Sequence, residues 1–185
     1  MKWNINRQGR AAGRHNGGFT LIELMVVIAI IAVLASLSVP VIGRALESAR
    51  RAQANTEVAA LHSAVRAYYN EYSRFPHQGD GTAEYIDGNS RLLNVLRARD
   101  GTGNSGHANN RRRIVFLEVT DRSLSDDEAN PDFVDPWGRP YRVMVDIDFE
   151  GAITPRDHDE AEVLVAAWSL GEEPENVERH ITSWK

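Results

Sequence analysis

The carboxylate of Glu23 stands at the start of the most apolar stretch of the chain, where its chemistry requires a partner. The 20 residues that follow it, 24–43, contain no charged side chain. On membrane-insertion scales, an ionised carboxylate toward the centre of an apolar helix costs about 2.5 to 3.5 kcal/mol. Glu23 therefore either lies at headgroup level at the end of a helix or meets a cation.

The element that must position Glu23 is the apolar run itself. At a rise of about 1.5 Å per residue, a helix of this length extends about 30 Å, which matches the hydrocarbon core of a bilayer. Residues 1–18 before it hold four cations and no acid, namely Lys2, Arg7, Arg10 and Arg14. Positive charge keeps a flank cytoplasmic, so the sequence predicts a membrane helix with the remainder of the chain across the membrane.

Gly18 is followed by FTLIEL, residues 19–24, with the acid at the fifth position after the glycine. This pattern, after a basic leader, resembles the type IV prepilin and type II secretion pseudopilin family. The resemblance implies cleavage between Gly18 and Phe19 by a membrane prepilin peptidase, followed by methylation of the new amino terminus on Phe19. The new ammonium and Glu23 would then neutralise each other between neighbouring subunits in a filament core of low dielectric.

Two simpler interpretations of the amino-terminal region stay open. Ser36, Leu37 and Ser38 form a small-x-small triplet that could end a secretory signal peptide, but the apolar run exceeds the usual length of about 7 to 15 residues. A plain signal anchor needs only the span and its basic flank, and it leaves Gly18 and Glu23 unexplained. We therefore predict a leader at 1–18, a transmembrane half-helix at 19–43 and a periplasmic head at 44–185.

The charge balance argues against a partner made of nucleic acid. The 185-residue chain has no cysteine and a formal charge of −5, and loss of the four leader cations leaves 17 basic against 26 acidic residues, a net charge of −9. An acidic body repels phosphates. The basic run Arg111, Arg112, Arg113 is interpreted as a solvated strand entry or as ion-pair partners for a neighbouring subunit.

The helical pattern continues beyond the apolar run. Apolar residues recur at intervals of three and four, which indicates one apolar helix face: Ala45, Ala49, Ala52, Val58, Leu61, Val65, Tyr68 and Tyr72. Phe75 and Pro76 stop the pattern, because proline disfavours helix in the residue before it. Pro40 predicts a kink or local melting, and a simple kink and a functional hinge are both consistent with it.

The rest of the chain predicts a small head of class α+β. A short amphipathic helix is expected at 90–98, with Leu92, Leu93, Val95 and Leu96 facing inward, and an exposed loop at 100–110. Residues 114–119, 141–147 and 163–168 are rich in Val, Ile and aromatics and predict an antiparallel sheet. The sheet would cover the outer half of the long helix, as in a pilin-like fold.

Two carboxy-terminal segments strengthen the resemblance: Asp135-Pro136-Trp137-Gly138, and Trp168-Ser169-Leu170-Gly171 ahead of Ile181-Thr182-Ser183-Trp184. They are similar to the DPWG turn and the C-terminal loop of major pseudopilins. Asp135 and Pro136 would initiate a turn, and Trp137 would pack against the head.

In that family the C-terminal loop binds calcium through paired aspartates just before the terminal Ile and Trp. Arg179 and His180 stand at those positions here, and the loop carries Glu172, Glu173, Glu175 and Glu178. Calcium requires six to eight oxygen ligands, and an arginine repels it. A second candidate loop, 146–157, places Asp146, Asp148, Glu150, Gly151 and Asp157 at EF-hand-like positions. An acidic hairpin turn is the preferred interpretation there, so no metal and no other cofactor is expected.

Enzyme motifs do not occur in the sequence: it has no cysteine nucleophile, no G-x-S-x-G, no H-E-x-x-H and no phosphate loop. A signal-anchored enzyme or binding domain is the alternative from another class. The resemblance implies instead a pseudopilin that polymerises with copies of itself into a short periplasmic filament. Its other implied partners are the prepilin peptidase, the inner-membrane assembly platform, minor pseudopilins and, before assembly, membrane lipid. A type IV pilin of a surface fibre is the runner-up within the family.

Overall fold

The computed structural model describes residues 18–76, 84–85 and 88–184. The chain divides into two compact units, Met1–Arg44 and Ala45–Lys185. The leader cations lie outside the described residues, so the prediction of a basic leader is not tested by the structure. Helix α1, Leu21–Tyr72, contributes residues to both units.

The first unit is formed, within the described residues, by residues 18–20 and the beginning of α1. α1 is helical without interruption from Leu21 to Tyr72, so the local melting predicted at Pro40 does not occur. Within the part of the chain that the structure describes, no helix combines the length and the apolarity that crossing a bilayer requires.

In the second unit, α1 presents a buried stripe with helical spacing. Its members are Ala54, Val58, Leu61, Val65 and Tyr68, each at most 2% exposed. The predicted face was wrong over its first turns, because Ala45, Ala49 and Ala52 are exposed. The stripe instead continues back through half-buried polar side chains, those of Glu47, Arg51 and Glu57. The first turns of α1 in this unit therefore meet the head through polar side chains, and the later turns add the apolar stripe.

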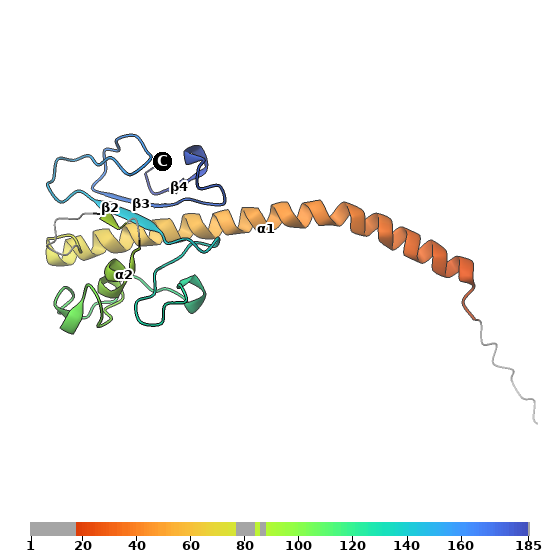
Figure 1. The fold of residues 1–185 in the computed structure, drawn as a ribbon, viewed down its shortest axis with the longest axis horizontal. Helices are drawn as coiled ribbons and strands as arrows, with labels where there is room; N and C mark the ends of the chain where they lie inside the picture. The colour runs from red at the N-terminus through yellow and green to blue at the C-terminus, as the bar shows by residue number, and fades with distance from the viewer. Residues whose placement is uncertain (1–17, 77–83, 86–87, 185) are drawn as a thin grey trace, which may run out of the picture. The chain divides into compact units, whose positions relative to one another are not determined.

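The sheet is antiparallel, with its four strands in the order β1-β2-β3-β4. The strands are β1 Glu84–Tyr85, β2 Arg142–Val145, β3 Val165–Ser169 and β4 Ile181–Thr182. Val143 pairs with Ala167 and Val145 with Val165, and these four side chains belong to the core that also contains the α1 stripe. Figure 1 shows the yellow part of α1 running along β2 and β3. This arrangement confirms the predicted pilin-like α+β fold.

Helix α2, Ser90–Leu96, ends two residues earlier than predicted but buries the four expected side chains. The strand predicted at 114–119 was wrong: this segment has no regular secondary structure and pairs with none of the described strands. Its amides at Phe116 and Leu117 donate to the carbonyl oxygen of Leu96, at 2.8 and 3.2 Å, and Leu117 is 4% exposed. The segment therefore contributes Leu117 to the core, and the end of α2 accepts two of its backbone hydrogen bonds. Three short 3-10 helices complete the head: η1 Ser105–His107, η2 Asp121–Ser123 and η3 Val177–Arg179.

The segment 100–110, predicted to be an exposed loop, is anchored by two buried asparagines. Asn104 and Asn110 are each 0% exposed. The Asn104 side chain donates to the Arg99 carbonyl oxygen at 2.8 Å and accepts from the backbone amide of Asn110 at 3.0 Å. The Asn110 amide group donates to the carbonyl oxygens of Val95 and Ile114, at 2.8 and 2.7 Å. An amide both donates and accepts, so these side chains satisfy backbone groups that the loop would otherwise bury unpaired.

A carboxylate on α1 organises the contact between the helix and the head. The Tyr141 hydroxyl donates to Glu57 Oε2 at 2.5 Å, and the Ser123 hydroxyl donates to Glu57 Oε1 at 2.9 Å. Tyr141 is fully buried. Burial, together with the hydrogen bond and the negative charge of Glu57, raises the pKa of Tyr141 well above its ordinary value.

This pKa shift predicts a loss of stability at alkaline pH. Because the folded chain holds the Tyr141 proton more tightly than the unfolded chain, the stabilisation is fully present below about pH 10 and declines as the pH rises further. In urea unfolding of the detergent-solubilised chain, we expect Tyr141→Phe to flatten the fall in the midpoint above pH 10. Tyr69→Phe is the matched control, since Tyr69 packs beside Phe75, with ring centres 4.7 Å apart, rather than against a carboxylate. Equal alkaline slopes for the two variants would contradict this assignment.

Candidate processing and assembly site

Gly18 and Phe19 precede α1 and are both exposed, Phe19 to 83%. A Cβ atom built at Gly18 would meet nothing within 4 Å, and its backbone does not require a left-handed conformation. The fold of the subunit therefore gives no reason for glycine at this position. A small residue here is consistent with recognition by another protein.

Glu23 closes a reciprocal cap at the start of α1. The carbonyl oxygen of Thr20 accepts the first helical hydrogen bond, from the Leu24 amide at 3.2 Å. Glu23 Oε2 accepts from the Thr20 amide and hydroxyl, at 2.8 and 2.7 Å, while the Glu23 amide donates to Thr20 Oγ1 at 3.2 Å. This is a capping box, which satisfies amide groups that a helix start leaves unpaired. Sequence reasoning missed it, although T-x-x-E before an apolar run is its known signature.

The capping box gives the Glu23 carboxylate a second role beside the predicted one. Capping requires an oxygen that accepts hydrogen bonds, and both hydrogen bonds that Thr20 donates to Glu23 reach Oε2. Neutralising an ammonium requires the negative charge. Glutamine can provide the first function but not the second, so the two roles can be separated by substitution.

The helix that follows the cap is apolar on every side. The large apolar side chains from Leu21 to Leu34 are between 45% and 77% exposed. A helix that is apolar all round is stable only when it is covered, by lipid or by other helices. The first unit thus presents a long exposed apolar surface immediately after the Thr20–Glu23 cap.

The predicted DPWG turn is present in the head. Asp135 is 3% exposed, and its Oδ1 accepts from the amides of Trp137 and Arg139 at 3.0 and 2.9 Å. Its Oδ2 accepts from the Ser169 hydroxyl at 2.6 Å, which ties the turn to β3. Gly138 has a φ of 83°, a conformation that favours glycine. Trp137 is half-buried and donates through Nε1 to Glu47 Oε2 at 3.3 Å, so the turn contacts the polar part of α1.

The EF-hand-like loop directs its acids to different partners. Asp146 is 1% exposed, and its carboxylate accepts from the Gly151 amide at 2.8 Å and from the Glu150 amide at 3.3 Å. Burial alone would raise the pKa of Asp146, but a hydrogen bond shared with the Asp148 carboxyl group and the bonds from these amides lower it. Asp157, at the last ligand position, lies 3.8 Å from the Arg142 guanidinium. Asp146 therefore caps its own turn.

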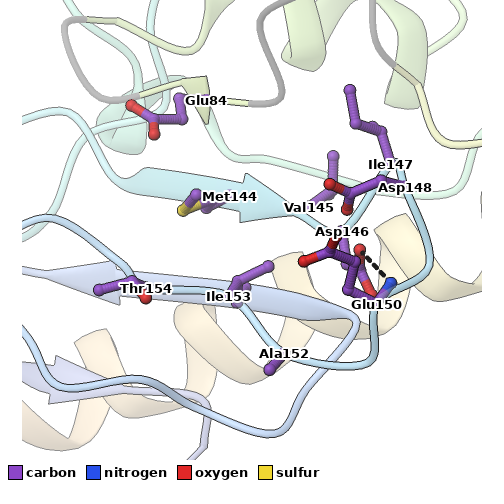
Figure 2. Close-up of a pocket in the computed structure, with 10 residues that line it drawn as sticks. All are labelled: Glu84, Met144, Val145, Asp146, Ile147, Asp148, Glu150, Ala152, Ile153 and Thr154. Carbon is purple, nitrogen blue, oxygen red and sulfur yellow. Dashed lines mark hydrogen bonds between the residues drawn. The ribbon is translucent and has the colours of Figure 1, made fainter.

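Figure 2 shows this turn at one side of an open cavity of about 480 Å³. Glu84 from β1 lies across the cavity from Asp146, Asp148 and Glu150 in this view. Among the described residues, no group of three acidic, histidine or cysteine side chains is arranged to hold a metal ion.

The three consecutive arginines are exposed and lie close to the end of α1. Arg112 forms an ion pair with Glu71, and its amide donates to the Tyr72 hydroxyl at 3.2 Å. One of the three therefore has a partner within the same chain. The predicted strand entry is absent, because the segment after them forms no strand.

The fold and the helix start together define a pilin-like subunit. The family described as the prokaryotic N-terminal methylation motif matches residues 13–39. Type II secretion system core protein G of Klebsiella pneumoniae is 40% identical over 127 residues, which cover 69% of this chain and 73% of that protein. The corresponding protein of Aeromonas hydrophila is 29% identical over 131 residues, 71% of this chain and 74% of that protein. The chain belongs to the type II secretion system core protein G family.

A pilin is also similar over a shorter region. The type IV major pilin PilA of Myxococcus xanthus is 38% identical over 60 residues, 32% of this chain and 27% of that protein. No solved structure matches the chain at a significant level.

Proposed function

We propose that the chain is a pseudopilin subunit that polymerises through its amino-terminal helix into a short periplasmic filament for type II-like protein secretion. The observation that carries this proposal is the exposed apolar helix with an acid at its cap. Such a surface has to be covered, and side-by-side packing of identical helices covers it while bringing each Glu23 near the start of a neighbouring helix. The role is structural, and no catalytic role is proposed.

Before assembly, residues 19–43 hold the precursor in the inner membrane, with the head at 44–185 in the periplasm. The uncharged run 24–43 and the leader cations support this placement. When the filament forms, the same apolar surface would move out of the lipid and pack against other subunits. The prepilin peptidase, the assembly platform and minor pseudopilins are the partners that this pathway requires.

A surface pilin is the second candidate, because the chain is also similar to the type IV major pilin PilA over a shorter region. Only 60 residues support that comparison, whereas those with core protein G cover about 70% of the chain. Since secretion filaments and surface fibres share a tail and differ in their heads, the longer comparisons favour secretion.

Cleavage after Gly18 is the first expected result. Mass spectrometry of protein extracted from membranes should show Phe19 as the first residue, with one added methyl group. Gly18→Ala should slow cleavage less than Gly18→Glu, because bulk and charge both hinder a site at which the fold itself leaves open space. Cells without the prepilin peptidase provide the control and should retain Met1. A mature terminus at Val39, or an intact Met1 in cells with active peptidase, would refute the proposed processing.

A further inference from the structure

The C-terminal loop between β3 and β4 is closed by side chains from two other places in the head and by contacts of its own. It covers residues 170–180, contains η3 and has near its start Gly171, whose φ is 67°. Arg139, from the DPWG turn, donates to the Gly171 carbonyl oxygen. Arg51, from α1, donates through Nη2 to the Arg179 carbonyl oxygen at 3.0 Å. The two ends of the loop are thus each bound by a guanidinium group.

Two contacts within the loop close it further. Arg179 forms an ion pair with Glu173. His180 is 7% exposed, and its Nε2 lies 2.9 Å from the Pro174 carbonyl oxygen. A carbonyl oxygen can only accept, so His180 carries its proton on Nε2 and donates there. Its Nδ1 lies 3.2 Å from His158 Nε2.

These contacts use the oxygens that a cation in the loop would need. Calcium takes six to eight oxygens, commonly backbone carbonyls together with carboxylates. Here the carbonyl oxygens of Gly171, Pro174 and Arg179 accept protein donors, and one carboxylate is paired with a guanidinium. A guanidinium is always charged and only donates. It therefore repels a divalent cation, and the oxygen that it binds already accepts a hydrogen bond. The residues present do not fit the calcium site that the family resemblance implies.

We propose that this loop is closed without a metal ion, by Arg51, Arg139, Arg179 and His180, which bind the loop oxygens in place of calcium. Hydrogen bonds from Arg51 and Arg139 thereby connect the loop to α1 and to the DPWG turn. The four closing residues come from α1, from the turn and from the loop itself. The proposal concerns the head alone and goes beyond the proposed function, because it holds whether or not the chain forms filaments.

The test uses the full chain purified in detergent, with thermal unfolding followed by circular dichroism. The midpoint of wild-type protein should change by less than about 1 °C between 1 mM CaCl₂ and excess chelator, since ligand binding to the folded state alone would raise it. Arg51→Met and Arg139→Met should each lower the midpoint by about 2 to 4 °C in both solutions. Arg50→Met is the matched control, because Arg50 is the exposed neighbour of Arg51 on the same helix, and it should melt like wild type.

Amide hydrogen exchange gives a local readout of the same closure. In Arg51→Met and Arg139→Met, peptides covering 170–180 should exchange faster than in Arg50→Met, with or without calcium. Two results would overturn the proposal. One is a wild-type midpoint that falls by several degrees in chelator and is restored by calcium but not by magnesium. The other is agreement of Arg51→Met and Arg139→Met with Arg50→Met in both midpoint and exchange.

Discussion

Glu23→Gln is expected to abolish filaments while leaving the subunit folded, inserted and processed. Glutamine still accepts the Thr20 hydrogen bonds of the capping box but carries no charge. Each Phe19 ammonium in the filament core would then lose its counter-charge, and breaking a buried ion pair costs about 3 to 5 kcal/mol. Every subunit in a filament carries this cost, so polymer yield in sheared fractions should fall to background while the amount of monomer stays near wild type.

Two companion variants separate charge from capping. Glu23→Val removes both functions, and it should also eliminate filaments. Thr20→Ala removes the capping hydroxyl and keeps the carboxylate, so it should cost about 1 kcal/mol of helix stability and leave filaments in place. If Glu23→Gln polymerises like wild type while Thr20→Ala does not, capping rather than ion pairing is the role of this carboxylate.

The structure shows why some elements were predictable from sequence and others were not. α2, β2 and β3 lie in apolar segments that are bounded by turn residues, so local composition was sufficient to predict them. The end of α1 near Phe75 and Pro76 follows from the same kind of local rule. Strands β1 and β4 have only two residues each, and their pairing depends on neighbours distant in sequence. The segment 114–119 had the composition of a strand but no partner edge.

The prediction of the buried face of α1 failed in the turns where alanine was the only apolar residue. Alanine is small enough to suit a buried or an exposed helix position, so Ala45, Ala49 and Ala52 do not distinguish the two faces. The true face carries Glu47 and Glu57, whose burial depends on the hydroxyl and indole donors that other segments bring to them. A pattern of apolar residues cannot predict such pairs, because each half is polar when it is read alone.

In the candidate site, too, some residues could be predicted from the sequence and others could not. Gly18, Phe19 and Glu23 could be selected from spacing alone, and their roles in cleavage, methylation and assembly stay predictions. The capping box was readable but was overlooked, because the acid was considered only as a charge in an apolar run. Arg179 and His180 were visible in the C-terminal loop itself. The donors that reach the loop from elsewhere could not be found from the sequence, since Arg51 and the Arg179 carbonyl group that it binds are separated by 128 positions in the chain.

The head should fold without the apolar half of α1 but not without the outer half. A fragment beginning at Arg44 retains the buried stripe that covers the sheet, and we expect a cooperative thermal transition and a monomer in size-exclusion chromatography. A fragment beginning after Phe75 loses Val58, Leu61, Val65 and Tyr68 from the core, all at most 2% exposed. It would expose the inner face of the sheet and should aggregate.

A matched pair of leucines on the same helix tests this within the longer fragment. Leu61 is 2% exposed, whereas Leu46 is 53% exposed. Leu61→Ala should lower the free energy of unfolding by about 2 to 5 kcal/mol, because it leaves a cavity between helix and sheet. Leu46→Ala should change it by less than about 0.5 kcal/mol. Equal unfolding midpoints for the two variants in urea, or a soluble and cooperative fragment lacking α1, would show that the sheet does not need the helix to complete its core.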